Sequence, residues 1–276
     1  MSIVLAVTNQ KGGVGKTTTS VNLAASLAAM KREVLLVDLD PQGNATMGSG
    51  VDKNDLSASV YEVLVGEMSV NDARVNAEAA GYYLLAANVE LTGAEIELLD
   101  IPQREYCLTR ALEGTRDEYD FIIIDCPPSL SLLTINGLVA ADGVVIPMQC
   151  EYYALEGLSA LVTTIGRITS QLNPGLHIEG IIRTMYDPRN SLTRDVSAQL
   201  LDHFGDKVYR TIIPRNVRLA EAPSYGVPIL FYDKQSRGAR AYLALAGEVV
   251  RRCSNELSGS ESSSKESSSE GAENGN

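Results

Sequence analysis

The sequence has few residues of the kinds that build disulfide frameworks, metal centres or membrane spans. Its four cysteines show no CxxC or other zinc-ligand spacing, and with no secretion signal they indicate reduced thiols of a cytoplasmic protein. The two histidines, His177 and His203, have no partners at ligand spacing. No apolar run approaches the ~18 residues of a membrane span, and the N-terminus lacks a charged region followed by a hydrophobic stretch. We therefore expect neither a zinc protein nor a membrane or secreted protein.

The net charge of −12 is distributed unevenly along the chain. Residues 1–176 carry 10 Lys and Arg against 22 Asp and Glu, residues 177–253 carry 12 against 8, and residues 254–276 carry 1 against 5. The overall balance argues against a bulk nucleic-acid binder, because a phosphate backbone attracts positive charge. The local excess of positive charge still permits a basic face built from the C-terminal third.

The order of the apolar segments predicts an α/β protein. With 276 residues, of which 45% are hydrophobic, the chain is long enough for one large domain. Strand-like runs alternate with helical patterns, which indicates a mostly parallel, twisted sheet with helices on both faces. Strands are expected at 3–7, 34–37, 82–86, 121–124, 143–147, 178–184 and 208–213, and helices at 16–30, 91–99, 103–115, 132–141, 155–172, 192–204 and 238–253.

The C-terminal end of the chain differs in composition from the rest. Residues 254–276 are mainly Ser, Glu, Gly and Asn, with one Leu. Such a composition cannot bury enough apolar surface to order itself. We therefore divide the chain into a domain at residues 1–253 and a disordered, acidic, Ser-rich tail at residues 254–276.

The segment KGGVGKTT at residues 11–18 lies between an apolar run and a helical pattern and predicts a phosphate-binding loop. Its glycines allow backbone N–H groups to converge on an anion, and the N-terminus of the following helix adds partial positive charge. Lys16 would reach the β- and γ-phosphates of a nucleotide, and the Thr17 hydroxyl would hold Mg²⁺. The usual GxxxxGK[ST] pattern is altered, because Gln10 replaces the first glycine and Lys11 follows it. Nucleotide contacts are expected from Gly12, Gly13, Val14, Gly15, Lys16, Thr17 and Thr18.

Two further apolar runs end in carboxylates. Asp38 and Asp40 follow the run at 34–37, and their spacing places both on the same side of an extended chain. At the carboxyl end of a strand they would face the phosphates. The alternative is a carboxylate that caps a turn, which applies more to Asp38 than to Asp40. Asp125 follows the run at 121–124 and has the Walker-B pattern of an acid that supports Mg²⁺ directly or through water.

Together these motifs resemble those of the ParA family of chromosome-partitioning ATPases, in the deviant-Walker-A class of P-loop ATPases. The resemblance covers residues 2 to about 252 and includes VDLDPQGNAT (37–46), IIIDCPPSLS (122–131), QCEYYALEGL (149–158) and IPRNVRLAEAPSYG (213–226). The last two motifs are typical of the short chromosomal ParA/Soj-like proteins. Because so few residues precede the loop, we expect no N-terminal helix-turn-helix domain of the kind found in longer plasmid ParA proteins, and no sequence-specific operator binding.

The resemblance implies a catalytic or metal-binding role for five residues of the motifs. Lys16 corresponds to the P-loop lysine, and Thr17 to the Mg²⁺ ligand. Lys11 corresponds to the signature lysine that reaches across a dimer to the partner's nucleotide phosphates. Asp40 corresponds to the acid that helps to position the attacking water, and Asp125 to the Walker-B acid.

The resemblance also implies the cofactors and the partners. ATP and Mg²⁺ would be enclosed between two monomers, with the loop that contains Pro214 and Asn216 packed near the adenine. Without an arginine finger, which can be worth ~10³–10⁵ in rate, hydrolysis would be slow. A ParB-like centromere-binding protein would stimulate it and so reset the dimer.

Arginines at positions matching Arg189 and Arg218 serve the ParA family in non-specific DNA binding by the ATP dimer. With Arg215 they are the predicted DNA-binding residues here, and the alternative is an ordinary solvated or ion-paired surface arginine. Such contacts go to phosphates and carry no sequence code, so we expect a cytoplasmic, nucleoid-associated protein. Further basic residues that can add to this face are Arg183, Arg194, Lys207, Arg237 and Arg240.

Other functions remain open at this point. A MinD-like membrane-surface ATPase for placing the division site would share the loop and the acids, but it needs a C-terminal amphipathic helix. Here the helix expected at 238–253 runs into an acidic tail that anionic lipid would repel. An electron-transfer protein like the nitrogenase iron protein would need paired cysteines to bridge a cluster, a pattern that Cys126 and Cys150 do not match. A scaffold that binds nucleotide without hydrolysing it is the remaining alternative.

Overall fold

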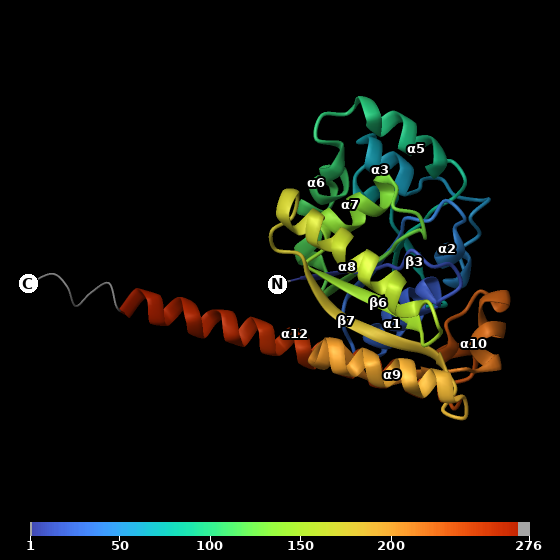
Figure 1. Cartoon of the computed structure of the whole chain (residues 1–276). Helices are drawn as coiled ribbons and strands as arrows, with labels where there is room; N and C mark the ends of the chain where they lie inside the picture. The colour runs from blue at the N-terminus through green and yellow to red at the C-terminus, as the bar shows by residue number, and fades with distance from the viewer. Residues whose placement is uncertain (1, 270–276) are drawn as a thin grey trace, which may run out of the picture.

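The computed structural model describes residues 2–269, which form an eight-stranded sheet with helices on both faces (Figure 1). The strand order is β3-β4-β2-β5-β1-β6-β7-β8, and every pairing is parallel except that of β3 with β4. This confirms the predicted α/β class and mostly parallel sheet. The strands are β1 (Ile3–Val7), β2 (Val34–Asp38), β3 (Val75–Ala77), β4 (Tyr82–Leu85), β5 (Phe121–Asp125), β6 (Gly143–Gln149), β7 (His177–Tyr186) and β8 (Val208–Pro214).

The helices connect successive strands. They are α1 (Lys16–Ala29), α2 (Asn44–Gly48), α3 (Val60–Val65), α4 (Val70–Ala73), α5 (Leu91–Glu97), α6 (Cys107–Glu113), α7 (Leu132–Ala140), α8 (Ala154–Gln171), α9 (Ser191–Phe204), α10 (Val217–Glu221), α11 (Ile229–Tyr232) and α12 (Arg237–Ser269). Short 3-10 turns are η1 (Leu98–Asp100), η2 (Arg104–Tyr106), η3 (Arg116–Glu118), η4 (Gly205–Lys207) and η5 (Ala222–Tyr225).

Alternate residues of the central strands point into two separate cores. In β1, Val4 and Ala6 belong to the core beneath α3 to α9, whereas Leu5 and Val7 belong to the core beneath α1, α11 and α12. Because both faces are covered, β2 and β5 are buried along their whole length. This explains why the strands read as continuous apolar runs in the sequence.

The elements that the sequence did not predict are all short. Helices α2, α3, α4, α10 and α11 span four to six residues each, too few for a helical period to emerge from the pattern. Strand β3 has three residues and pairs antiparallel at the sheet edge. The longer elements agree with the prediction within a few residues, the C-terminal helix excepted.

Helix α12 does not end near residue 253, where the sequence predicted the tail to begin. It continues to Ser269, and its last turns extend away from the body of the molecule (Figure 1). A helix that is already packed on the domain can be extended without a further nucleation step, because each added residue that is ordered gains one hydrogen bond. The domain boundary at 253 stays a prediction, and residues 270–276 of the expected tail lie outside the described residues.

The register between β7 and β8 shifts, and a buried arginine occupies the irregularity. Arg183 donates hydrogen bonds from Nη1 to Ser197 Oγ (3.0 Å) and from Nη2 to the carbonyl oxygens of Tyr209 (3.0 Å) and Arg210 (3.4 Å). The sequence placed Arg183 among residues that can add to a basic face. That interpretation is wrong, because the side chain is buried and donates hydrogen bonds to two carbonyls of β8.

Glu248 of α12 completes the same edge of the sheet. Its carboxylate accepts hydrogen bonds from the backbone N–H groups of Arg210 and Thr211 at 2.8 and 2.9 Å and from Arg252 Nη2 at 3.1 Å. Burial opposes the charge, but these donors lower the pKa of Glu248 below its ordinary value. Side chains rather than a further strand therefore satisfy the polar groups of edge strand β8.

Replacement of Glu248 by alanine is expected to destabilise the fold by about 2–4 kcal/mol, because buried N–H groups lose their acceptor. Urea unfolding at pH 7 measures the effect, with the exposed Glu113→Ala on α6 as control. Since the folded-state pKa of Glu248 is depressed, its contribution is present above the ordinary carboxyl pKa and is lost as pH falls through the folded value. An unchanged unfolding midpoint would contradict this role.

Candidate nucleotide-binding site

The loop between β1 and α1 has the backbone shape of an anion cradle. Gly13 and Gly15 adopt left-handed conformations, with φ of 73° and 88°, which residues with a Cβ rarely adopt. Gly15 is the N-cap of α1, and no side chain caps the helix or places an acid in its first turn. The first N–H groups of α1 and its partial positive charge are therefore available to a bound anion.

Neighbouring strands hold this loop in place. The Thr184 hydroxyl of β7 donates to the carbonyl of Val14 at 2.8 Å. Asn9 accepts from the N–H of Lys11 at 2.9 Å and donates to the carbonyl of Pro147 at 2.8 Å. Residues far apart in sequence thus fix the loop before any ligand binds, which lowers the ordering cost of binding.

Lys16 is the cation inside the cradle. Its residue is 8% exposed, and its Nζ donates to the carbonyl of Lys11 at 3.4 Å. Burial lowers the pKa of Lys16, while the charges of Asp125 and Asp40 oppose that shift. Lys16 forms no salt bridge with any residue of 2–254, the part of the chain whose side chains the structure describes, so its charge is not committed to a carboxylate there and can meet a phosphate.

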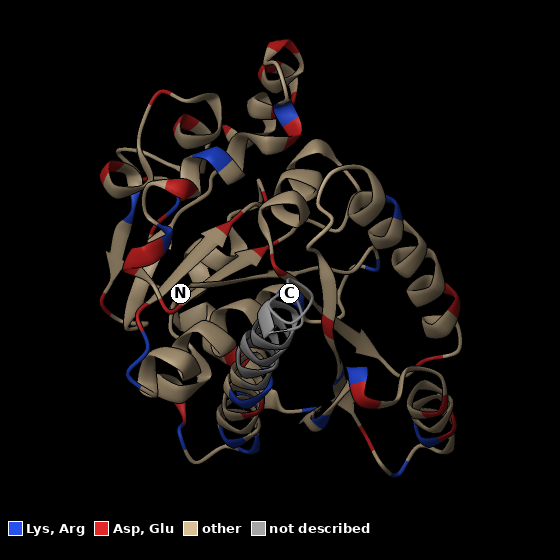
Figure 2. Ribbon diagram, turned by 90° about the vertical axis from the view of Figure 1, so that its left-hand side faces the viewer, with Lys and Arg blue, Asp and Glu red and all other residues tan. Residues whose placement is uncertain are grey.

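Two buried acidic residues, Asp38 and Asp125, are paired in register where β2 and β5 end. Figure 2 shows acidic positions, in red, at the ends of central strands. Asp38 Oδ2 accepts from both the N–H and the hydroxyl of Thr46 at 2.8 Å, and Asp38 Oδ1 accepts from the N–H of Asp40 at 3.1 Å. Asp38 therefore caps the turn that leads to α2, which is the alternative that the sequence left open. Both carboxylates are fully buried.

Asp125 has the free acceptor that a metal site requires. Its Oδ1 accepts from the Ser20 hydroxyl at 2.8 Å, whereas its buried Oδ2 has no hydrogen-bond partner. Burial and the neighbouring charge of Asp38 raise the pKa of Asp125, although hydrogen bonding from the hydroxyls of Ser20 and Thr17 opposes this. A divalent cation near Oδ2 would relieve both the missing contact and the repulsion between the carboxylates.

The residues present fit a magnesium ion bound together with a nucleotide. Residues 2–269 contain no group of three or more His, Cys, Asp and Glu side chains that could hold a metal ion. Mg²⁺ commonly takes one or two protein oxygens and completes its shell with water and phosphate. Thr17 and Asp125 would supply those protein contacts, and the ion would neutralise the phosphate charge that develops during transfer.

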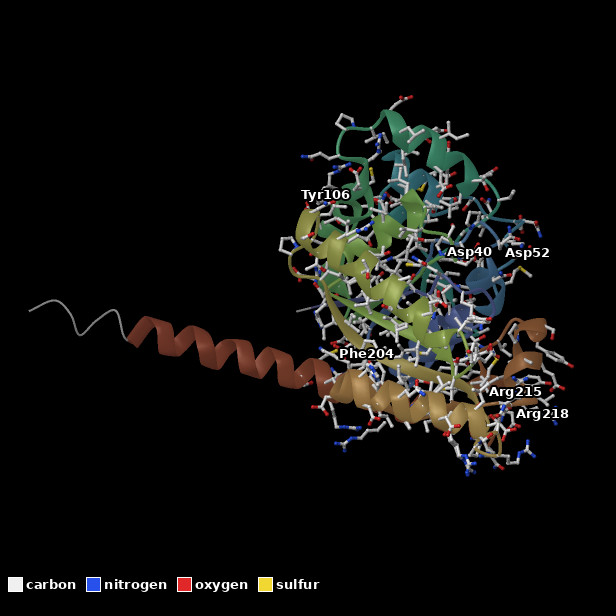
Figure 3. The ribbon with its side chains drawn as sticks, in the orientation of Figure 1. Asp40, Asp52, Tyr106, Phe204, Arg215 and Arg218 are labelled. Atoms are coloured by element: carbon white, nitrogen blue, oxygen red, sulfur yellow. The ribbon has the colours of Figure 1, made fainter. Side chains whose placement is uncertain are left out.

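Asp40 is half-buried, one residue beyond the buried Leu39. Its Oδ1 accepts from the N–H of Gln42 at 2.9 Å, which holds the carboxylate at the start of the turn before α2. Figure 3 shows Asp40 and Asp52 on the same side of the molecule as Arg215 and Arg218. The carboxyl ends of the parallel strands meet at this side, as expected for a ligand site of an open α/β sheet.

A cavity of about 510 Å³ opens beside the loop, within the size range of cofactor pockets. Its walls come from α1, α2 and the segment at 220–227, and its lining includes Thr17, Thr18, Asn44, Met47, Pro223 and Val227. Pro214 and Asn216, predicted to contact the adenine, do not line it. Asn216 instead caps α10 by accepting from the N–H of Leu219 at 3.3 Å. The contribution of residues 220–227 was missed, although Pro223 within the quoted motif was a signal.

The segment at 220–227 is fixed against the end of α2 by two glycines. A Cβ added at Gly50 would lie 2.8 Å from the carbonyl oxygen of Gly226, too close for any side chain. Both residues have positive φ, 82° and 63°. The two backbones therefore touch at the rim of the cavity.

Lys11 does not share the cradle with Lys16. Its Nζ lies 2.6 Å from Glu151 Oε2, and both side chains are about half exposed. Glu151 begins the turn between β6 and α8, next to Tyr152 and Tyr153, which are 74% and 70% exposed and pack edge to face. Lys11 thus stands at the surface in front of the loop, paired with a carboxylate of its own chain.

The predicted DNA-binding arginines lie at the same side, and two of them are ion-paired. Arg189 forms a two-bond pair with Asp187, and Arg218 pairs with Glu221 at 2.9 Å and with Asp233 at 3.8 Å. Arg215 is exposed and has no ion pair with the side chains described at residues 2–254. The ion-paired alternative considered for these arginines therefore describes Arg189 and Arg218 in the isolated chain.

Comparison with known proteins places this site in a family. The AAA domain family matches residues 2–178. The chain is 55% identical to the sporulation initiation inhibitor protein Soj of Bacillus subtilis, over 91% of this chain and 99% of Soj. It is 52% identical to the chromosome-partitioning ATPase Soj of Thermus thermophilus, over 90% and 95%. The chain belongs to the ParA/Soj family of chromosome-partitioning ATPases. The resemblance stated from the motifs is thereby confirmed.

A solved structure agrees with this family assignment. The cobyrinic acid a,c-diamide synthase of Mycobacterium smegmatis, determined with bound ADP and magnesium, superimposes with a TM-score of 0.81 at 42% identity, over 92% of this chain and 96% of that chain. The Soj proteins are more similar in sequence, so the ParA/Soj assignment carries more weight than the name of this structure. None of the helices within residues 2–269 is long and apolar enough to cross a lipid bilayer.

Proposed function

We propose that this chain is an ATP- and Mg²⁺-dependent partitioning ATPase whose ATP-bound dimer binds DNA without sequence preference. Slow hydrolysis, stimulated by a ParB-like centromere-binding partner, would return it to monomers. It would act in the cytoplasm on the nucleoid. The proposal combines the ParA/Soj family with the geometry of one residue, Lys11.

The position of Lys11 is the observation that carries the proposal. Lys16 already occupies the cradle, whereas Lys11 is half exposed and faces away from it toward Glu151. An exposed lysine in front of a phosphate loop can approach the nucleotide of a second copy. ATP would then join two chains, because each lysine gains a γ-phosphate partner only in the closed dimer.

Two features support DNA binding by that dimer. Arg189, Arg215 and Arg218 lie after the carboxyl ends of β7 and β8, on the side of the phosphate loop. Dimerisation would double this set of cations. Non-specific affinity depends on the number of phosphates neutralised, so it would become dependent on ATP.

The MinD-like alternative needs a C-terminal helix with a free apolar face. In α12, Ala239, Tyr242, Leu245 and Val249 are buried in the core beneath α1. The apolar face of this part of α12 is therefore already used within the domain. Sedimentation with anionic liposomes and ATP is the direct comparison, and we expect the protein to stay in the supernatant.

The experiment that tests the proposal is duplex DNA binding with ATP, with ADP and without nucleotide. We expect retention with ATP alone and a loss of ~10³-fold or more between 50 and 200 mM salt. Arg215→Glu and Arg218→Glu should abolish retention while ATP hydrolysis persists. The exposed Arg167→Glu on α8 is the matched control and should bind normally. Equal retention with ATP and ADP would overturn the proposal.

A further inference from the structure

We infer that Asp187 and Glu221 are affinity-limiting residues of the DNA-binding surface, because each holds one of its arginines in an ion pair that competes with a DNA phosphate. The inference rests on the proposed function and concerns the regulation of that same surface. It assigns a role to two acids at a site where the sequence indicated only cations.

Asp187 binds Arg189 in a bidentate ion pair, the same geometry that the arginine would use to bind a phosphate. Arg189 Nε and Nη2 donate to the two carboxylate oxygens at 2.9 and 2.7 Å, in a fork that uses one whole edge of the guanidinium. The Arg189 side chain is 88% exposed, and Asp187 is its only ion-pair partner among the residues whose side chains are described. These bonds lower the pKa of Asp187 to about 2, and the pair is therefore charged throughout the neutral pH range.

Glu221 holds Arg218 in a second pair of the same kind. Arg218 Nη1 donates to Glu221 Oε2 at 2.9 Å, and Arg218 Nε lies 3.8 Å from Asp233 Oδ2. The Tyr232 hydroxyl also donates to Glu221 Oε2, at 3.2 Å, which keeps the carboxylate in place. Asp233 would remain near Arg218 after loss of Glu221. The Arg218–Glu221 pair should therefore limit DNA affinity less than the Arg189–Asp187 pair does.

The consequence is a weak surface on each monomer. A DNA phosphate must displace the carboxylate of Asp187 from Arg189 or share the arginine with it. In both cases the contact between arginine and phosphate contributes less binding free energy. Exposed ion pairs of this kind change an equilibrium by up to about fivefold. Two copies in a dimer would together lower DNA affinity by up to about 25-fold, and the single copy in a monomer would lower it by up to about fivefold. The acids would thus weaken the DNA retention of the monomer as well as that of the dimer.

Asp187→Asn is the sharpest variant, because it removes the charge and keeps the local turn. The N–H of Arg189 donates to Asp187 Oδ1 at 3.1 Å, and an asparagine side-chain oxygen can accept the same bond. Duplex DNA affinity is measured by fluorescence anisotropy with ATP and with ADP. We expect Asp187→Asn to bind about 5- to 20-fold tighter with ATP, Glu221→Gln to gain less, and Asp187→Asn to show new retention with ADP.

Two controls separate the ion pair from a general effect of charge. Asp195 is exposed on α9, and its side chain has no partner among residues 2–254, where side chains are described. Asp195→Asn removes the same charge nearby and should change affinity less than twofold. In an Arg189→Ala background, Asp187→Asn should lose its gain. In Asp187→Asn the dependence of DNA affinity on salt concentration should also become steeper, by about one phosphate contact per site. A merely structural role of Asp187 would not change this slope.

The outcomes distinguish this inference from the proposed function. Wild-type protein that fails to bind DNA with ATP overturns the proposed function. Wild-type binding with equal gains for Asp187→Asn and Asp195→Asn, or a gain that survives Arg189→Ala, overturns the inference alone. Thermal unfolding of each variant verifies that the domain remains folded.

Discussion

Replacement of Lys11 by alanine is expected to abolish ATP-dependent dimerisation while ATP binding to the monomer is preserved. Lys16, the glycines of the loop and the open N-terminus of α1 all remain, so the phosphates keep their own-chain contacts. Truncating one partner of a desolvated charge pair at an interface costs about 2–5 kcal/mol. Light scattering with a slowly hydrolysed ATP analogue should therefore report monomers at concentrations where the wild type is dimeric, and calorimetry should report similar nucleotide affinity.

Glu151→Gln is the opposing variant for this prediction. It removes the carboxylate that holds Lys11 at 2.6 Å in the isolated chain. Because the pair is half exposed, its loss should favour dimerisation by at most about fivefold. Weaker dimerisation of Glu151→Gln would mean that the carboxylate contributes to the dimer itself. Dimers of Lys11→Ala with the ATP analogue would contradict the role given to the lysine.

Replacement of Asp40 by alanine is expected to slow ATP hydrolysis by about 10²–10⁴-fold, the usual contribution of a group that positions or activates a nucleophile. In the proposed cycle, dimerisation would need Lys11 and an intact γ-phosphate but not cleavage of that phosphate, so the variant should stay dimeric and remain on DNA. Phosphate release and DNA retention after ATP is diluted measure the two effects. Wild-type hydrolysis at ~10 s⁻¹ without a partner would already contradict the proposed slow switch.

Asp52→Ala is the matched control for Asp40. Asp52 is exposed on the same side of the molecule (Figure 3), and its side chain accepts hydrogen bonds only from Asn54 among the residues whose side chains are described. Its removal should leave hydrolysis within about twofold of the wild type, as is usual for a surface substitution. Rapid turnover by Asp40→Ala, or an equal loss in Asp52→Ala, would remove Asp40 from the mechanism.

The parts of the site that the sequence predicted are those that depend on local order. A strand, a glycine turn and a helix start follow one another in the chain, so the cradle and its lysine could be inferred without long-range contacts. Asp38 shows the limit of such inference. Its two-residue spacing from Asp40 places both on one side of an extended chain, but Thr46 of the short helix α2 binds Asp38 and leaves Asp40 half-buried.

Arg183 and the cavity wall show a second limit. A basic residue near the end of a strand resembles a surface cation in the sequence, and its burial follows from the register between β7 and β8, which only the folded sheet defines. The wall at 220–227 reaches the phosphate loop from nearly the other end of the chain. Composition indicated that positive charge gathers in the C-terminal third, but it could not reveal that Asp187 and Glu221 hold two of the arginines.

The close approach of Gly50 and Gly226 has a mechanical consequence. Gly50 follows the helix that begins after Asp40, and Gly226 ends the stretch that follows Arg218. No side chain lies between the two glycines. A displacement of the main chain after α2, at Gly50, toward Gly226 would therefore be passed to the segment at 220–227, which follows Arg218, by direct backbone contact. In the proposed cycle, hydrolysis of ATP and release of DNA would then be mechanically coupled.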